Sequence, residues 1–100
     1  FEIGNFPDYR SIMDSPHLPE RYWLAAALGR SRVAPTYPDL LKMLDDPKPN
    51  VVCQVLDGLS RRSDPGARAI ILEKLKASDH WYVQWYAYQA LRSMGWTQKP

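Results

Sequence analysis

The side chains in this sequence that could do chemistry are few, and their spacing does not assemble a catalytic site. The reactive candidates are two histidines, one cysteine and a carboxylate pair: His17, His80, Cys53, Asp45 and Asp46. Metal binding and nucleophilic catalysis both need several such groups close to one another in space. No glycine-rich phosphate loop, Ser-His-Asp order or Cys-x-x-Cys motif accompanies them. The sequence therefore predicts no catalytic, metal-binding or cofactor-binding residue, and we expect a protein that is not an enzyme.

The elements that position these side chains follow from an internal repeat. The segment RYWLAAALGR at residues 21–30 returns 31 residues later as VCQVLDGLSR, and 32 residues after that as QWYAYQALRS. In each copy a leucine (Leu28, Leu59 or Leu91) follows a residue with a small side chain or none. The small residue allows a neighbouring helix to approach, and the leucine fills the groove between the two helices. A chain with this period is built from stacked copies of one helical unit.

Helix boundaries recur with the same period. Aspartate, serine and proline, which end one helix and begin the next, return at the junctions between the repeats. No segment alternates apolar and polar residues for long, as a half-buried strand would. We therefore predict an all-α solenoid of three helical hairpins. The six expected helices span residues 7–14 and 18–31, 36–45 and 49–62, and 66–77 and 80–95.

Within this frame the reactive side chains lie apart. His17 and His80 occupy nearly equivalent places in the first and third units, which puts them roughly 20 Å apart if adjacent hairpins pack at about 10 Å. They cannot share a metal ion. Cys53 has no histidine near it in the repeat frame, so we interpret it as a structural thiol. Asp45 and Asp46 lie at a helix boundary, where capping explains them better than acid–base catalysis.

Two copies of the repeat carry a family pattern. The third copy reads DHWYVQWYAYQAL over residues 79–91, and the first reads RYWLAAALG over residues 21–29. Both resemble the VRxxAAxALGxxG pattern of the short bacterial HEAT-like repeats of the phycobilisome-lyase type. The middle copy keeps the apolar frame but has Val52 at the arginine position and Ser60 at the glycine position. The resemblance covers nearly the whole chain, and it implies a solenoid whose second helices line a concave face.

Large aromatic side chains occupy positions on these second helices that such repeats usually fill with polar residues. We predict that they form, with nearby polar side chains, a protein-binding groove on the concave face. The predicted binding residues are Tyr22, Trp23, Gln54, Asp57, Trp85, Tyr86 and Gln89. An alternative stays open, since aromatic residues of a terminal repeat also close the core or dock on another part of a longer chain. Trp81 matches a family position that often holds tryptophan, so we expect a structural role for it.

Arginines form a second candidate site, at the ends of the second helices. Arg30 and Arg61 are in register, with Arg32 and Arg62 beside them, and Arg92 lies one position earlier in the third copy. Cations at helix C-termini are stabilised by the helix dipole by about 0.3–1 kcal/mol, which gives the row a structural explanation. A functional row would instead attract an acidic protein surface, lipid headgroups or phosphates. The formal net charge of only +2 argues against a dedicated nucleic-acid binder.

Three function classes fit these features. The favoured one is a non-enzymatic interaction or scaffold module that binds another protein, or another domain of the parent chain. The first alternative is a chaperone or lyase-like protein that attaches a cofactor, although three repeats leave little room to enclose a tetrapyrrole. The second is a HEAT-like DNA-binding protein, in which Asp57 near Trp23 and Trp85 would be the acidic residue. HEAT-like repeats occur in all three classes, so the resemblance is more specific for fold than for function.

Composition bounds the remaining expectations. The 100 residues, 45% of them hydrophobic, suit one helical domain over residues 1–100, with repeats over 7–31, 36–62 and 66–95. No apolar run reaches the length of a membrane span. The single cysteine excludes an internal disulfide and favours a reducing compartment such as the cytoplasm. The chain begins with Phe1 and not with methionine, which fits a segment of a longer protein.

Overall fold

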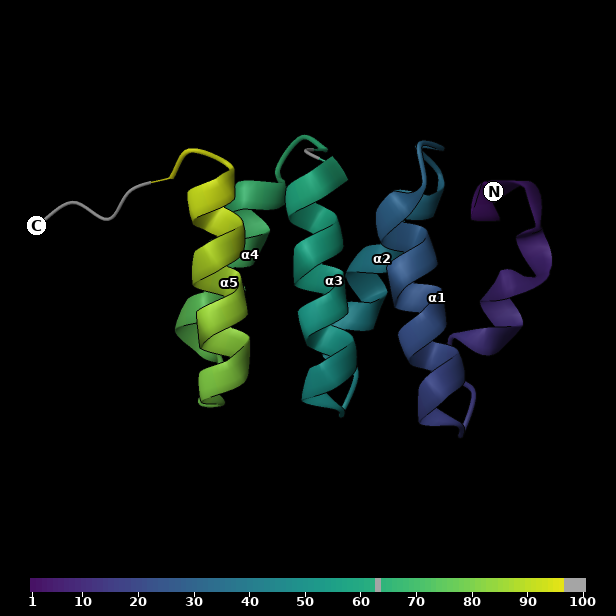
Figure 1. The fold of residues 1–100 in the computed structure, drawn as a ribbon, viewed down its shortest axis with the longest axis horizontal. Helices are drawn as coiled ribbons and strands as arrows, with labels where there is room; N and C mark the ends of the chain where they lie inside the picture. Colours follow the sequence, from purple (N-terminus) through teal and green to yellow (C-terminus); the bar gives the residue numbers. More distant parts are fainter. Residues whose placement is uncertain (63, 97–100) are drawn as a thin grey trace, which may run out of the picture.

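The computed structural model describes residues 1–62 and 64–96, and every regular element among them is helical (Figure 1). The described residues form five α-helices and three short 3₁₀-helices, two of them before α1 and one between α2 and α3. In chain order the elements are η1 (Ile3–Asn5), η2 (Pro7–Ile12), α1 (Leu18–Arg30), α2 (Thr36–Lys42), η3 (Met43–Asp45), α3 (Pro49–Arg62), α4 (Ala67–Ala77) and α5 (Trp81–Ser93). The predicted all-α class is therefore confirmed for the described part of the chain.

The helices form two layers in an elongated molecule. The three longest, α1, α3 and α5, lie side by side in one row, and α2 and α4 lie behind them (Figure 1). α3 packs against both α1 and α5, α4 packs against α5, and α2 with η3 bridges α1 and α3 from behind. The principal extents of 46 × 25 × 17 Å reflect this stacking. One face of the molecule is thus built from the three second helices of the repeats.

Burial confirms the register of the repeat. Leu28, Leu59 and Leu91, the equivalent leucines of α1, α3 and α5, are fully buried. The apolar residues four positions before each leucine are fully buried as well, as expected for residues that share one helix face. Leu40 of α2 and Ile71 of α4 complete the same core from the second layer. The apolar residues that recur with the repeat therefore form the contact between the two layers.

α1 and α3 meet backbone to backbone at two glycines. A Cβ atom built on Gly29 would lie 2.7 Å from Cα of Gly58, and one built on Gly58 would lie 2.6 Å from Cα of Gly29. The sequence predicts a close approach at the residue before each leucine, and Gly58, which precedes Leu59, is such a contact. Its partner on α1 is Gly29, which follows Leu28, and not Ala27. The boundary between the two helices therefore lacks side chains at this point.

The junctions before the three long helices share one hydrogen-bonded turn. The side chains of Ser15, Asp46 and Ser78 accept hydrogen bonds from the backbone N–H groups two residues later, at 3.1, 2.9 and 3.2 Å. Short polar side chains form turns of this kind in competition with helical hydrogen bonds, and so end one element before the next begins. Their spacing of 31 and 32 residues is that of the sequence repeat, so the period extends to the loop geometry.

A largely buried ion pair joins the first unit to the second. Arg21 Nε lies 2.8 Å from Asp46 Oδ2, and the two side chains are 11% and 6% exposed. Arg21 Nη1 also donates to the carbonyl of Ser15 at 2.7 Å. In the third unit Gln84 stands at the position of Arg21, and its Nε2 donates to the carbonyl of Ser78 at 2.7 Å. Both side chains hold the first turn of their helix against the preceding loop.

The predicted α-helix over residues 7–14 is wrong in type. This segment forms the 3₁₀-helix η2 and ends at Ile12, so the described residues contain five α-helices and not six. A six-residue segment is too short to offset the cost of α-helix nucleation by itself. Its conformation is set instead by contacts with α2, because the Tyr9 hydroxyl donates to Asp39 and Arg10 Nε lies 3.0 Å from the same carboxylate.

The other helix boundaries differ from prediction by smaller amounts. The helix expected over residues 36–45 is α-helical to Lys42 and continues as η3, and a 3₁₀ last turn is common at helix ends. α3 has the predicted bounds, and α1, α4 and α5 begin and end within two residues of prediction. None of the described helices is both long enough and apolar enough to cross a membrane.

Candidate protein-interaction face

The seven predicted binding residues lie on the three helices of the front row, and the aromatic ones are strongly exposed. Exposed fractions are 42% for Tyr22, 48% for Trp23, 53% for Trp85 and 41% for Tyr86, while Gln54 and Asp57 are half-buried and Gln89 is exposed. A cluster of exposed aromatic rings marks an interaction surface more often than a scatter of single apolar residues does. The face of α1, α3 and α5 is therefore the candidate site.

A groove of about 390 Å³ lies over α3, between tyrosines of α1 and α5. We call it the tyrosine groove, and it is lined by Tyr22, Pro49, Asn50, Cys53, Gln54, Tyr82 and Tyr86. Tyr22 comes from α1, Tyr82 and Tyr86 come from α5, and α3 supplies the residues between them. The amide Nε2 of Gln54 donates to the Tyr22 hydroxyl at 2.7 Å and so fixes this ring across the boundary of α1 and α3.

The repeat register explains why the two tryptophans lie outside this groove. Tyr22 on α1 faces α3, because it accepts the hydrogen bond from Gln54. Tyr22 thus points from its own helix toward the next helix of the row. Trp85 occupies the same position on α5, which is the last helix of the row, so it points away from α3. Trp23 occupies the position of Gln54 in its repeat. It faces the amino-terminal segment of the chain, and its ring centroid lies 6.2 Å from that of Phe1. The tryptophans thus flank the row on opposite sides.

The aromatic residues of α5 contact one another in two pairs. The rings of Trp81 and Tyr82 stack with centroids 3.8 Å apart, and Trp85 meets Tyr86 edge to face at 5.3 Å. Trp81, for which the sequence suggested a structural role, is 63% exposed and lies outside the core. Each tyrosine of the groove on α5 is therefore supported by the tryptophan that precedes it in the chain.

Four residues of the tyrosine groove were missed by sequence reasoning, although helical spacing contained a signal for two of them. The missed residues are Pro49, Asn50, Cys53 and Tyr82. Tyr82 lies four residues before Tyr86, and Asn50 lies four residues before Gln54, so each shares a helix face with a predicted residue. Extending the predicted stripe by one helical turn would have included both.

The thiol of Cys53 is part of the groove lining, and its burial disfavours the reactive form. Cys53 is 9% exposed, and this burial raises the pKa of its thiol. The reactive form of cysteine is the thiolate, which a raised pKa disfavours at neutral pH. Its Sγ lies 4.0 Å from the backbone carbonyl of Tyr82, on the neighbouring helix. The interpretation of Cys53 as a structural thiol fits these contacts.

The histidines do not contribute to a metal site in the part of the chain that the structure describes. No group of three or more histidine, cysteine, aspartate or glutamate side chains is arranged there to hold a metal ion. The ring of His80 instead stacks on Tyr82 with centroids 5.4 Å apart. His17 lies exposed at the start of α1.

A smaller furrow of about 150 Å³ lies along the boundary of α1 and α3. It is lined by Ala26, Gly29, Arg30, Gln54, Asp57, Gly58 and Arg61. Asp57 Oδ2 lies 3.0 Å from Nη2 of Arg61, a residue one helical turn after Asp57 on α3. Asp57, which the DNA-binding alternative would use as its acidic residue, is therefore an ion-paired residue of this furrow.

A larger cleft of about 670 Å³ opens where α1 and α3 end. We call it the arginine cleft, and it is lined by Gly29, Arg30, Ser31, Arg32, Ala34, Arg61, Arg62 and Asp64. The Arg62 side chain is 5% exposed, and its Nε and Nη2 lie 2.8 and 3.2 Å from the Asp64 carboxylate. Its Nη1 donates to the Leu28 carbonyl at 2.9 Å and to the Thr36 hydroxyl at 2.7 Å. Arg62 is therefore a structural cap on the end of α1.

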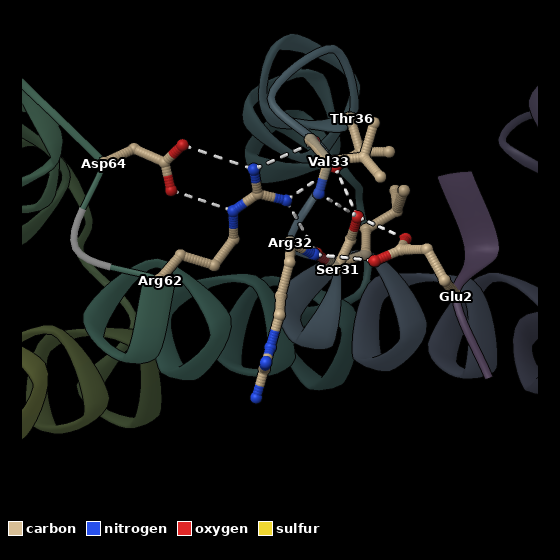
Figure 2. A network of polar contacts seen from close by, with 8 residues as sticks. Glu2, Ser31, Arg32, Val33, Thr36, Arg62 and Asp64 are labelled. Atoms are coloured by element: carbon tan, nitrogen blue, oxygen red, sulfur yellow. Dashed lines mark hydrogen bonds and ion pairs between the residues drawn. The ribbon is translucent and has the colours of Figure 1, made fainter. Parts of the chain in front are cut away.

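Glu2 extends the same polar network from the other side of the loop between α1 and α2 (Figure 2). Its carboxylate accepts hydrogen bonds from the Ser31 hydroxyl at 2.6 Å, and from the N–H groups of Arg32 and Gly4 at 2.8 Å each. These bonds, that of Ser31 foremost, lower the pKa of Glu2 from an ordinary value of 4.5 to about 2. The main chain at Arg32 is thereby held, while the Arg32 side chain points away from the network (Figure 2).

Comparison with known proteins adds the family. The sequence model of the family described as HEAT repeats matches residues 7–92, from the start of η2 almost to the end of α5. The match is to HEAT repeats in general and does not single out the phycobilisome-lyase type. Searches of curated proteins and of solved structures gave no significant match. Because the family match covers most of the sequence and all of its stacked helical units, the chain belongs to the HEAT-repeat family.

Proposed function

We propose that this chain is a non-enzymatic interaction module that binds a segment of another protein on the face of α1, α3 and α5. HEAT repeats generally mediate protein–protein interaction or scaffolding. The observation that carries the proposal is the tyrosine groove. Its three tyrosines, Tyr22, Tyr82 and Tyr86, remain between 41% and 49% exposed around one depression.

The chemistry of tyrosine supports a protein ligand. A tyrosine ring offers a large apolar area, and its hydroxyl keeps a hydrogen bond when the ring is covered. Tyr22 has this arrangement, because its hydroxyl is bonded to Gln54 while 42% of the residue is exposed. Rings that stand on both sides of α3 suit an extended segment between them better than a flat protein surface.

The other predicted residues extend this face around the groove. Trp23 and Trp85 would contact the partner at the two ends of the row, and Asp57 and Gln89 lie one helical turn beyond Gln54 and Trp85 on their helices. Tryptophan and tyrosine are the commonest energetic anchors of protein interfaces. The partner is another protein or another domain of the parent chain.

No described feature favours the alternative functions over this one. Asp57 is ion-paired with Arg61, and the pKa of the Cys53 thiol is raised by burial. Neither group has the environment of an activated catalytic residue. The cofactor-attachment and DNA-binding alternatives are drawn from the range of functions among HEAT-like repeats, and we propose no reaction for this chain.

A displayed library of random nine-residue peptides, selected on the immobilised wild-type chain, tests the proposal. The affinities of the selected peptides are then measured by fluorescence anisotropy for the wild type, Tyr22→Ala and Tyr86→Ala. We expect each substitution to weaken binding by about 30-fold, which corresponds to the roughly 2 kcal/mol lost at an interface hot spot. The melting temperature of both variants should stay close to that of the wild type, because neither ring belongs to the core.

Phe6→Ala is the matched control, because Phe6 is an aromatic residue of 54% exposure that does not line the groove. It should bind the selected peptides like the wild type. If the selected peptides bind Tyr22→Ala and Tyr86→Ala as tightly as they bind Phe6→Ala and the wild type, the tyrosine groove is not the binding site. Failure to select any peptide would count against the proposed function itself.

Trp23→Ala and Trp85→Ala test whether the tryptophans belong to the binding face or to the fold. We expect both variants to fold and to bind more weakly than the wild type. Unfolding of either variant, without a separable loss of binding, would assign its tryptophan to the core.

A further inference from the structure

We propose that the bound segment is an extended acidic peptide, with an apolar side chain in the tyrosine groove and carboxylates at Arg30 and Arg32. This inference rests on the proposed function and gives the chemistry of its partner. Its basis is a row of three adjoining hollows that connects the two ends of the site, together with two arginines at one end that form no ion pair within the described residues.

Shared lining residues show that the three hollows adjoin. The tyrosine groove and the furrow both include Gln54, and the furrow and the arginine cleft both include Gly29, Arg30 and Arg61. The three hollows therefore adjoin one another in a row that runs from the tyrosines, along the boundary of α1 and α3, to the helix ends. Gly29 and Gly58, whose backbones meet at this boundary, line the furrow without side chains.

The length of this row of hollows suits a short extended segment. Gln54 and Arg61 are seven residues apart on α3, which is about 10 Å at the helical rise of 1.5 Å per residue. An extended chain advances about 3.3 Å per residue, so this span holds about three residues. The acidic residue of the ligand should therefore lie roughly three or four positions from the apolar residue that enters the groove.

The arginines at this end differ in whether an acidic side chain of the chain itself pairs with them. Arg62 is buried in its bonds to Asp64 and to the end of α1, and Arg61 is paired with Asp57. Arg30 and Arg32 are exposed, and neither takes part in an ion pair within the described residues.

The helix dipole does not account for this pair of free cations. Arg62 already donates to the Leu28 carbonyl at 2.9 Å, and Val33 O lies 3.4 Å from its second Nη. A cation at the end of α1 is therefore present without Arg30 or Arg32. Two free guanidinium groups beside a groove attract a segment of opposite charge and set its direction in the groove. Carboxylates match them because arginine binds carboxylates in a planar, bidentate geometry.

The peptide library described above also tests this inference. Selected peptides should be enriched in aspartate and glutamate at three or four positions from an apolar residue. Raising the salt concentration should weaken them, and the double variant Arg30→Glu, Arg32→Glu should lower their affinity by at least about ten-fold. The matched control is Arg68→Glu, a reversal of an exposed arginine on α4 in the other layer, which should leave the affinity within about two-fold of the wild type.

Each outcome separates this inference from the proposed function. Peptides that depend on Tyr86 but show no acidic enrichment, and that tolerate the double reversal, would overturn the inference and leave the proposed function intact. Acidic peptides that survive the double reversal would also overturn it, since another cation would then bind them. Peptides that are insensitive to Tyr22→Ala and Tyr86→Ala would contradict the tyrosine groove as the binding site instead, and failure to select any peptide would contradict the proposed function.

Discussion

Gly29 of α1 and Gly58 of α3 touch through their backbones, so that a Cβ atom on either residue would lie 2.7 or 2.6 Å from the Cα atom of the other. Real Cβ atoms do not approach backbone this closely, and a backbone atom cannot rotate out of the way. The contact therefore sets the separation of the two helices. The same pair of residues lines the furrow, so stability and the shape of the candidate site depend on one contact.

Gly58→Ala should lower the free energy of unfolding. Alanine favours a helix over glycine by about 1 kcal/mol, but overpacking a close contact costs typically about 1–3 kcal/mol. Because the clash here is with backbone, we expect the steric cost to exceed the gain, for a net loss of about 1 kcal/mol or more in urea unfolding. Gln89→Ala, on the exposed side of α5, is the control and should be neutral or stabilising. Equal stability of Gly58→Ala and wild type would refute the glycine contact.

Leu59→Ala should cost roughly 2–5 kcal/mol, because it removes methyl groups from a fully buried site. That is a large share of the stability of a domain of this size, about 5–15 kcal/mol. Thermal unfolding monitored by circular dichroism should show the melting temperature fall by about 10 °C or more. Leu72→Ala, at a half-buried position of α4, should have a smaller effect. A melting temperature unchanged by Leu59→Ala would contradict the repeat register.

Arg62→Ala and Arg61→Ala should differ greatly although the residues are neighbours. Removing Arg62 leaves Asp64 without its ion pair and the Leu28 carbonyl with the Ser31 N–H as its remaining donor, at a cost of about 3 kcal/mol for a buried pair. Removing Arg61 breaks an exposed pair with Asp57 one helical turn away, worth about 0.5 kcal/mol or less. Chemical denaturation of both variants measures the difference. Similar losses would mean that Arg62 is not the structural arginine.

The contribution of Glu2 to stability should depend on pH. Its pKa is lowered from 4.5 to about 2 in the folded chain by hydrogen bonds from Ser31, Arg32 and Gly4. A carboxylate with a lowered pKa stabilises the fold above its unfolded pKa and loses that contribution as the pH falls through the folded value. The wild type should therefore have a larger free energy of unfolding than Glu2→Gln above pH 4.5. This difference should disappear as the pH approaches about 2. A difference that is independent of pH would show that Glu2 acts through packing alone.

The sequence was sufficient to predict the long helices because the same apolar spacing recurs in three repeats. Equivalent leucines at 28, 59 and 91 define one buried stripe, and any other register would expose them. The segment at residues 7–14 lacked this support. Tyr9 and Arg10 bind Asp39, which lies 30 and 29 residues away along the chain, respectively. Such tertiary contacts outweigh local propensity in a short segment.

The candidate site was predictable only at the level of a helix face. The repeat register placed Tyr22, Gln54 and Tyr86 on one side, but the groove between them depends on ring orientations, such as that fixed by the hydrogen bond between Gln54 and Tyr22. The arginines were equally hard to separate, because Arg62 and Arg32 look alike in the sequence. Their burial is decided by the direction of each side chain at a helix end, which no local pattern contains.

The central place of α3 has a consequence for how the molecule opens. α1 and α5 each pack on α3, so the two outer helices are coupled through the middle one. In stacked repeats stability is close to a sum of nearest-neighbour terms, and local opening starts where neighbours are fewest. Amide hydrogens of α1 and α5 should then exchange through separate fraying events, while those of α3 exchange when the whole stack opens. A ligand held between tyrosines of α1 and α5 would join these events and make the two edges of the protein exchange as one unit.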